Sequence, residues 1–125
     1  MSLLADQRVD LNKLKTSCLD LSQVTEETPF GPEVLVYKVL GKMFALTAWE
    51  DDPVRLTLKS DPDEAQVLRG LYSAIQPGYH MNKEHWNTIT LDGTVPDAEL
   101  LRMIQESYKL VVQSLKKSDR ERLIL

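Results

Sequence analysis

The side chains with the most chemical potential gather in one stretch near residue 80. Both histidines, His80 and His85, lie there with Glu84 between them, and imidazole and carboxylate groups could bind a metal ion or move protons. Histidines at this spacing do not share one face of a regular element, and no nearby cysteine supplies a further zinc ligand. We therefore predict no metal ion and no other cofactor. We expect a histidine to make hydrogen bonds that fix a loop, with Asn82 and Asn87 capping its backbone groups.

Catalytic signatures are missing elsewhere in the sequence. Cys18 is the single cysteine, and it falls on the apolar stripe of an expected helix, where a thiol packs as a small buried side chain rather than acting as a nucleophile. We find no serine-centred nucleophile motif, no phosphate-binding glycine loop and no paired carboxylates. The acidic run Glu50–Asp52 suits a solvated turn. We predict that the protein is not an enzyme.

The composition is that of one globular domain. The chain has 125 residues, 42% hydrophobic and 27% charged, which is enough to bury a core as the single domain 1–125. No run approaches the roughly 20 apolar residues of a membrane span, and the lone cysteine suits a reducing compartment. We therefore expect a cytoplasmic monomer without a signal peptide that does not bind membranes. The net charge of −4 disfavours strong nonspecific binding to nucleic acids.

Hydrophobic periodicity predicts the elements that position these side chains. We expect a helix over about 6–22, strands at 34–40, 42–49 and 55–59, a helix that begins at Asp61 and carries apolar residues at 65, 67, 68 and 71, strands at 79–81 and 86–91, and a helix from Asp97 to about 115. Residues 25–28 are placed in a loop and 116–122 in a solvated tail. The predicted fold class is α+β, a two-layer sandwich of a five-stranded antiparallel sheet with helices on one face, in the order α-β3-α-β2-α.

Strand alternation predicts which side chains face away from the helices. Arg55, Thr57 and Lys59 alternate with the inward-facing Leu56 and Leu58, so they belong to the open face of the sheet. The same argument adds four residues to this face, and two lysines lie beside it, one at the first hairpin and one in the loop before the last strand: Lys38, Trp86, Thr88, Thr90, Lys42 and Lys83. Cations around an aromatic ring suit nucleic acid. The alternative is that these lysines only keep the sheet soluble.

Three segments of the chain resemble the MmcQ/YjbR family of small bacterial proteins: Thr28–Gly31, Lys38–Ala45 and Pro77–Thr88. The closing helix, with Ser107 and Tyr108 inside it, is similar too, so the resemblance covers nearly the whole chain. The sequence departs from the family at Leu40, where the family usually has a first glycine before Gly41. The resemblance implies a fold of the frataxin/CyaY type, with a flat antiparallel sheet covered by helices. It also implies DNA binding through a double-wing arrangement, although fold does not establish function.

These observations lead to two hypotheses about function. The first is DNA binding through the open sheet face and the loop Gly78–Trp86. The second is that the same face, with Trp86 on it and Trp49 near an edge, docks a protein partner, since tryptophan is a common interface anchor. Charge distinguishes the two, because DNA needs a continuous positive patch and a docking face needs a central apolar anchor with a polar rim. Either binding site would use the same residues: Lys38, Lys42, Arg55, Lys59, His80, Asn82, Lys83, His85 and Trp86.

Overall fold

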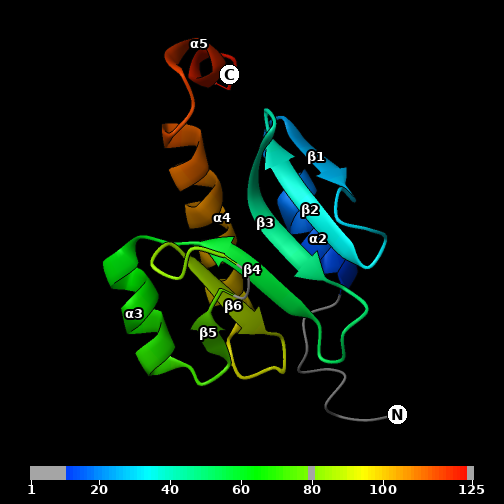
Figure 1. Ribbon diagram of the computed structural model, residues 1–125, viewed down its shortest axis with the longest axis vertical. Helices are drawn as coiled ribbons and strands as arrows, with labels where there is room; N and C mark the ends of the chain where they lie inside the picture. Colours follow the sequence, from blue (N-terminus) through cyan, green and yellow to red (C-terminus); the bar gives the residue numbers. More distant parts are fainter. Residues whose placement is uncertain (1–10, 79–80, 124–125) are drawn as a thin grey trace.

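The computed structural model describes residues 11–78 and 81–123, which form a six-stranded antiparallel sheet with helices packed on it (Figure 1). The elements in chain order are α2 (Leu11–Leu19), β1 (Val24–Glu27), β2 (Val34–Val39), β3 (Lys42–Ala48), β4 (Arg55–Lys59), α3 (Pro62–Leu71), β5 (Ile75–Pro77), β6 (Trp86–Thr90), α4 (Asp97–Gln113) and α5 (Lys117–Glu121). The strands lie in the order β1-β2-β3-β4-β6-β5. The α+β class with an open antiparallel sheet is thereby confirmed.

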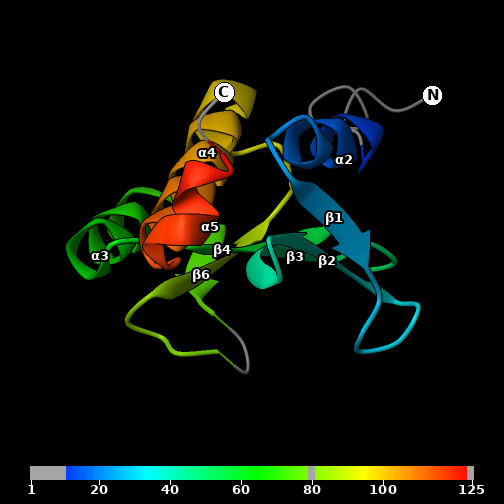
Figure 2. The same ribbon diagram turned by 90° about the horizontal axis from the view of Figure 1, so that it is seen from above.

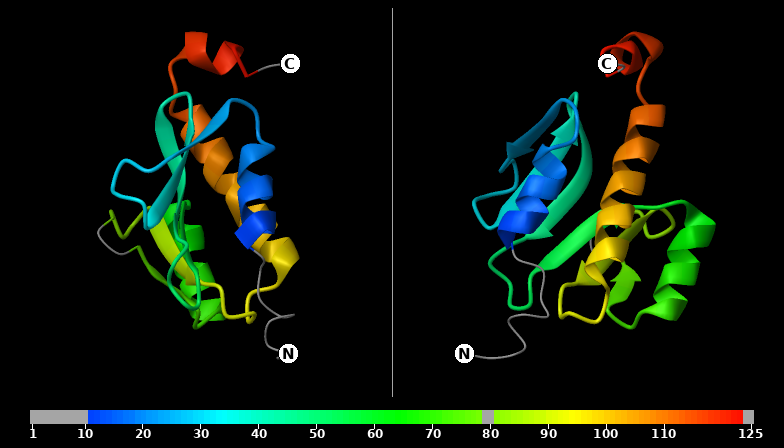
Figure 3. Two further views of the ribbon diagram at one scale, coloured as in Figure 1. Left: turned by 90° about the vertical axis from the view of Figure 1, so that its right-hand side faces the viewer. Right: turned by 180° about the vertical axis from the view of Figure 1, so that it is seen from behind.

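One face of the sheet is covered and the other is open. Helices α2 and α4 lie across the same face, while α3 packs beside the end of the sheet that β5 and β6 form (Figures 2 and 3). Helix α5 lies beyond the end of α4 (Figure 1). In the following, the open face is the sheet face turned away from α2 and α4.

The sequence explains where the described helices begin. The Asp61 carboxylate accepts hydrogen bonds from the amides of Asp63 and Glu64, and Pro62 occupies the first turn of α3. Helix α4 has acidic side chains, Asp97 and Glu99, at the positive end of its dipole. Its buried residues recur three and four positions apart, which holds one continuous stripe against the sheet: Leu100, Met103, Ile104, Ser107 and Val111.

The β2–β3 hairpin turns at the position where the sequence departs from the family. Leu40 and Gly41 have φ angles of +47° and +87°, and Val39 pairs directly with Lys42, so the loop has two residues with positive φ. Such turns match the twist of the flanking strands and favour glycine at both positions. Leu40 adopts the left-handed region in spite of its side chain, and it packs against the core.

The core fills the space between the sheet and the helices. Its largest fully buried side chains include Tyr37, Phe44, Leu56 and Ile89. The ring of Phe44 packs edge-on against the ring of Tyr108 in α4, and the two ring centroids are 5.4 Å apart. A register shift in the β2–β3 pair follows Tyr37, in the part of β3 that includes Phe44.

The structure corrects four expectations. Residues 24–27 form strand β1 rather than a loop, and Ile75–Pro77 forms the unexpected strand β5, so the sheet has six strands rather than five. The strand expected at 79–81 lies outside the described residues except for Met81, which is in no strand. Within the described residues the order becomes α-β4-α-β2-α-α, since the solvated tail expected at 116–122 contains a short helix without buried residues, α5 (Lys117–Glu121). In α3 only Ala65 and Leu68 are buried, and the apolar side chains of Val67 and Leu71 are exposed.

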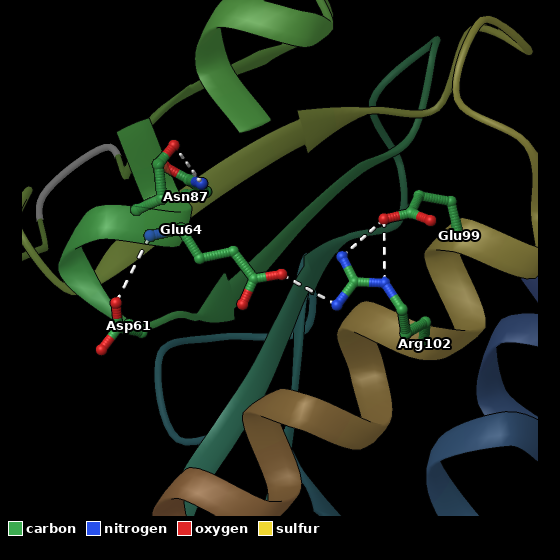
Figure 4. Close-up of polar contacts among 6 residues, drawn as sticks. Asp61, Glu64, Asn87, Glu99 and Arg102 are labelled. Carbon is green, nitrogen blue, oxygen red and sulfur yellow. Dashed lines mark hydrogen bonds and ion pairs between the residues drawn. The ribbon is translucent and has the colours of Figure 1, made fainter. Parts of the chain in front are cut away.

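Arg102 of α4 joins α4 to α3. Its guanidinium group contacts Glu64 of α3 at 2.8 Å, and its Nε donates to the carboxylate of Glu99, one turn earlier in its own helix, at 2.9 Å (Figure 4). In Figure 4 the side chains of Glu64 and Arg102 point toward each other from the two helices. This ion pair links α3 to α4. Arg69 of α3 in turn holds the loop described below.

Cys18 should be chemically inert in the folded protein. It is fully buried in α2, and burial, with a smaller contribution from Glu26, raises the pKa of its thiol to about 12. The reactive thiolate is therefore scarce at pH 8, and reagents cannot reach the sulfur. We expect slow labelling by a thiol reagent at pH 8 and complete, rapid labelling in denaturant, followed by absorbance. Fast labelling of the native protein would contradict the buried position.

Candidate functional site: a pocket on the open face

Strand pairing confirms the predicted orientation of the side chains along β4. Leu46 of β3, Thr57 of β4 and Thr88 of β6 lie opposite one another and turn away from the core residues Leu56 and Ile89. The neighbouring row contains Val34, Ala48, Arg55 and Thr90, and Lys59 pairs with Trp86 at the other end of β4. The open face is therefore apolar over β2 and β3 and polar along β4.

A pocket of about 390 Å³ lies on this face, which is within the size range of small-ligand sites. Its floor is formed by strand residues, and its walls include one side chain from each of two loops: Val34, Leu46, Ala48, Arg55, Thr57, Thr88, Phe30 and Met81. The Phe30 loop (residues 28–33) joins β1 to β2. The Met81 loop (described residues 78 and 81–85) joins β5 to β6. Both loops project on the open side of the sheet (Figures 2 and 3).

The pocket is apolar with a few polar groups. Five of its eight lining residues have apolar side chains: Phe30, Val34, Leu46, Ala48 and Met81. The hydroxyl groups of Thr57 and Thr88 are 2.8 Å apart, and these residues are only 6% and 8% exposed. The Phe30 side chain is 66% exposed, which is unusual for a phenylalanine. An exposed ring beside an apolar hollow indicates a binding surface.

The Phe30 loop is held by Trp49. The indole Nε1 donates to the Pro32 carbonyl at 2.8 Å, which ties the end of β3 to the loop, and the Gly31 amide donates to Thr28 at 3.3 Å. Trp49 was predicted to lie near an edge of the open face as a possible anchor for a partner. In the structure its polar atom is already used within the chain.

The Met81 loop is held from beneath by Arg69 of α3. The Arg69 guanidinium donates through Nε to Asn87 Oδ1 at 2.7 Å, and through a second nitrogen to the carbonyl oxygens of Lys83 and Trp86. The guanidinium donates to three acceptors from two nitrogens held in one rigid plane, a geometry that the single ammonium nitrogen of a lysine does not offer. Within the loop, Asn82 Oδ1 accepts from the Glu84 amide at 2.9 Å.

Gly78 lets the Met81 loop cross Trp86 closely. The Gly78 amide donates to the Trp86 carbonyl at 2.8 Å, and a Cβ at residue 78 would lie 2.9 Å from Trp86 Cβ and 3.1 Å from its carbonyl oxygen. Only a residue without a Cβ fits such an approach. The Trp86 side chain is consequently half-buried beneath the loop.

Replacing Gly78 with alanine should displace the Met81 loop. The new methyl group meets main-chain and Cβ atoms that cannot move aside, so we expect a loss of about 1–3 kcal/mol in unfolding free energy, measured by thermal unfolding. Gly70→Ala is the matched control. Gly70 lies in α3 with open space around it, so alanine there should stabilise the protein by about 0.5–1 kcal/mol. Equal effects of the two changes would contradict the described approach.

Several predicted binding cations have partners within the chain. Lys38 pairs with Glu27 at 3.1 Å, and this contact, together with the Thr25 hydroxyl, holds the pKa of Glu27 below its ordinary value. Arg55 contacts Asp51 at 2.7 Å. Lys42 turns toward α4, where its ammonium lies 3.3 Å from the Ser114 carbonyl. The open face therefore lacks a continuous positive patch over β1 to β3.

Two cations remain at one end of the pocket. Among the residues that the structure describes, Lys59 forms no ion pair, and Lys83 contacts only a main-chain oxygen, that of Gly78, at 3.3 Å. Lys59 pairs with Trp86 across the strands, and Trp86 bonds to Gly78, so all of these groups gather at that end. The opposite end, near Arg55, carries the acidic run Glu50–Asp52. The pocket thus has a basic end and an acidic end.

Of the two histidines, only His85 can be compared with the expectation. His80 lies outside the described residues. The main chain of half-buried His85 fixes the loop, since its amide donates to Asn82 at 3.2 Å and its carbonyl accepts from Ser60 at 2.7 Å. Asn87 does not cap this loop directly. It is buried on the helix side, where it bonds Arg69 and the Ala65 carbonyl.

Sequence reasoning missed the residues that shape the pocket. Phe30 and Met81 were not singled out, because nothing in a single loop sequence says that two loops will face each other over a sheet. A detectable signal for Phe30 was its position between two prolines and beside a glycine, in a segment too short to bury it. Arg69 gave no signal, because its partners are mostly main-chain oxygens distant in sequence.

The described residues contain neither a membrane-spanning helix nor a cluster of metal ligands. No helix in 11–78 or 81–123 is long and apolar enough to cross a membrane. Within the same residues, no three histidine, cysteine, aspartate or glutamate side chains are grouped to hold a metal ion. The prediction that the protein binds no metal stays a prediction, because His80 lies outside the described residues.

Comparison with known proteins places this chain in a family. The YjbR family model matches residues 19–110. The chain is 38% identical to protein YbdF of Escherichia coli O157:H7, over 87% of this chain and 89% of YbdF. It is 44% identical to YyaQ of Bacillus subtilis strain 168, over 61% of this chain and 63% of YyaQ. The crystal structure of DR2400 from Deinococcus radiodurans superposes with a TM-score of 0.87 at 42% identity, covering 98% of this chain and 93% of DR2400. The chain belongs to the YjbR family.

Proposed function

We propose that this protein is a non-enzymatic docking module whose open sheet face binds a protein partner. The observation that supports it is the apolar pocket between the Phe30 and Met81 loops. Binding energy at protein interfaces concentrates where a large side chain fills a desolvated pocket surrounded by a polar rim. Here the rim is supplied by Arg55 with Asp51, and by Lys59 with Lys83.

The charges on the open face favour protein docking over DNA binding. Affinity for DNA comes mainly from cations that neutralise phosphates, and acidic neighbours already neutralise Lys38 and Arg55. The loop between β3 and β4 adds the exposed carboxylates Glu50–Asp52, which repel phosphates. A protein partner that presents an apolar side chain to the pocket carries no phosphates and is not repelled in this way.

DNA binding is the second candidate, and the basic end of the pocket supports it. Lys59, Lys83 and Trp86 gather there, and a single-stranded base could stack on an indole ring beside two ammonium groups. This candidate predicts salt dependence, because counterion release drives binding to nucleic acids. The docking module predicts contact through the centre of the pocket instead.

Site-specific photo-crosslinking in cells that carry the native gene tests the docking module. A photoreactive amino acid in place of Leu46 should capture one discrete protein, since Leu46 lines the pocket. The same replacement at Gln66, which is exposed on α3, is the control and should not capture it. Adding Ala48→Phe, which fills the pocket, should abolish the product. Equal capture from positions 46 and 66, or capture that survives Ala48→Phe, would contradict docking in the pocket.

Fluorescence anisotropy with labelled oligonucleotides tests the second candidate. At about 20 mM salt we expect no saturable binding to a 20-base-pair duplex or to a single strand of the same length. If DNA binds, the logarithm of the affinity should fall with the logarithm of salt by about 0.9 for each duplex phosphate contacted, and Lys59→Glu should flatten that slope. Saturable, salt-dependent binding lost in Lys59→Glu would favour the DNA candidate over the docking module.

A further inference from the structure

The polar side chains of β4 form a stripe across the floor of the pocket. Arg55, Thr57 and Lys59 are at alternate positions of the strand and face the open side. Arg55 and Thr57 line the pocket, and Lys59 lies two residues further along, next to Trp86. Residues two apart on a strand are separated by about 6.6–6.8 Å. The backbone position that carries the Lys59 side chain therefore lies at a fixed distance from Thr57 in the pocket floor.

The two ends of this stripe differ in electrostatic character. At one end Arg55 is neutralised by Asp51, with Glu50 and Asp52 exposed nearby. At the other end Lys59 forms no ion pair within the described part of the chain, and Lys83 is satisfied only by a carbonyl oxygen. A bound segment gains from placing a carboxylate at the Lys59 end and loses from placing one at the Arg55 end.

An extended segment has the same repeat as the strand beneath it. Its side chains at positions i and i+2 point the same way and lie about 6.6–6.8 Å apart. A segment lying along β4 with a large apolar side chain over Thr57 therefore brings the side chain two positions away over Lys59. Met81 can adapt to the shape of the apolar group, because its side chain is unbranched and flexible.

We propose that the protein partner is recognised through an apolar–x–acidic segment, whose apolar side chain fills the pocket while its carboxylate pairs with Lys59. This inference rests on the proposed docking function and gives its chemistry. A phenylalanine or leucine suits the volume of about 390 Å³, and an aspartate or glutamate lies two residues before or after it. A basic side chain at that position would meet Lys59 and Lys83 and be disfavoured.

Short peptides and the isotopically labelled protein test the proposal by NMR titration at low salt. The probes are end-blocked heptapeptides, Gly-Ser-Phe-Ser-Glu-Ser-Gly and its reverse, each with matched versions carrying Gln, or Lys, in place of Glu, or Ser in place of Phe. We expect one Glu peptide to bind about threefold more tightly than its Gln counterpart, the size of a part-exposed ion pair, and the Lys version to bind most weakly. Amide shifts should centre on Leu46 and Thr57.

Two variants of the protein make the test specific. Lys59→Met removes the charge but keeps an unbranched side chain only one atom shorter, so it should equalise the Glu and Gln peptides without weakening the Gln peptide. Lys109→Met, at an exposed site on α4, is the matched control and should leave the difference intact. Equal affinities of the Glu and Gln peptides for the unaltered protein, or a difference that survives Lys59→Met, would overturn the proposal.

The outcomes separate this inference from the function on which it rests. If Phe-containing peptides bind in a manner that Ala48→Phe abolishes, but the acidic residue has no effect, only the inference fails. If the Phe and Ser versions bind equally, or none binds at millimolar concentration, the pocket is not an anchor site and both fail. A shift caused by an octathymidylate and lost in Lys59→Met, with no shift from any peptide, would assign the site to nucleic acid.

Discussion

Replacing Ile104 with alanine is expected to lower the unfolding free energy by about 2–5 kcal/mol, the usual cost of truncating a buried isoleucine. Ile104 is 2% exposed in the middle of the α4 stripe, where its side chain belongs to the main core. The loss combines the transfer of the removed carbons to water with the cavity left behind. Chemical denaturation monitored by circular dichroism measures it.

Leu101→Ala is the control for this change, because it removes a similar side chain from the same helix. Leu101 is 42% exposed, so its truncation should cost less than about 1 kcal/mol. Together the two variants test the phase of α4 rather than its helix propensity, which alanine favours at both positions. If both variants lost equal stability, the assignment of the α4 face that packs on the sheet would be wrong.

The second large effect is expected at Ser107, a polar residue in the middle of the same apolar stripe. Its hydroxyl donates to the Phe44 carbonyl at 2.5 Å and accepts from the Lys59 amide at 2.9 Å, so it joins α4 to both β3 and β4. Removing it leaves these groups unsatisfied at about 1–3 kcal/mol each, and we expect Ser107→Ala to cost about 2–4 kcal/mol in denaturation experiments.

Ser73→Ala provides the control for loss of a hydroxyl, since Ser73 is exposed in the turn before β5 and should lose less than about 0.5 kcal/mol. An unchanged stability of Ser107→Ala would mean that water replaces the hydroxyl, and the described bond to Phe44 would then have no structural role. The hydrogen bond from the Lys59 amide to the Ser107 hydroxyl also holds the end of β4 that carries the proposed recognition lysine.

The parts of the fold that could be predicted are those set by local patterns. The stripe of α4 repeats every three or four residues, and Leu56 and Leu58 alternate with Arg55, Thr57 and Lys59, so helix phase and strand orientation followed from the sequence. Strand β1 could not be predicted in this way. Val24–Glu27 has one apolar residue and two glutamates, and it is a strand because it pairs with β2.

The site was predictable only in outline for the same physical reason. Strand alternation predicts which side chains face away from the helices, and the strand pairing agrees with it for Arg55, Lys59 and Trp86. The pairing of Lys38 with Glu27 could not be foreseen, because Glu27 lies in a strand that the sequence did not reveal. The pocket itself depends on two loops, distant in sequence, that project on the same side of the sheet. Such meetings are tertiary and leave no periodic signal.

The central claim is that the pocket on the open face holds an apolar side chain of a protein partner. Its most direct test is the affinity of the partner captured through position 46, purified and titrated calorimetrically against the unaltered protein and Ala48→Phe. We predict at least a tenfold loss of affinity, about 1.4 kcal/mol, with an unchanged melting temperature, because the added ring occupies the pocket. Equal affinity for the two proteins would contradict the claim.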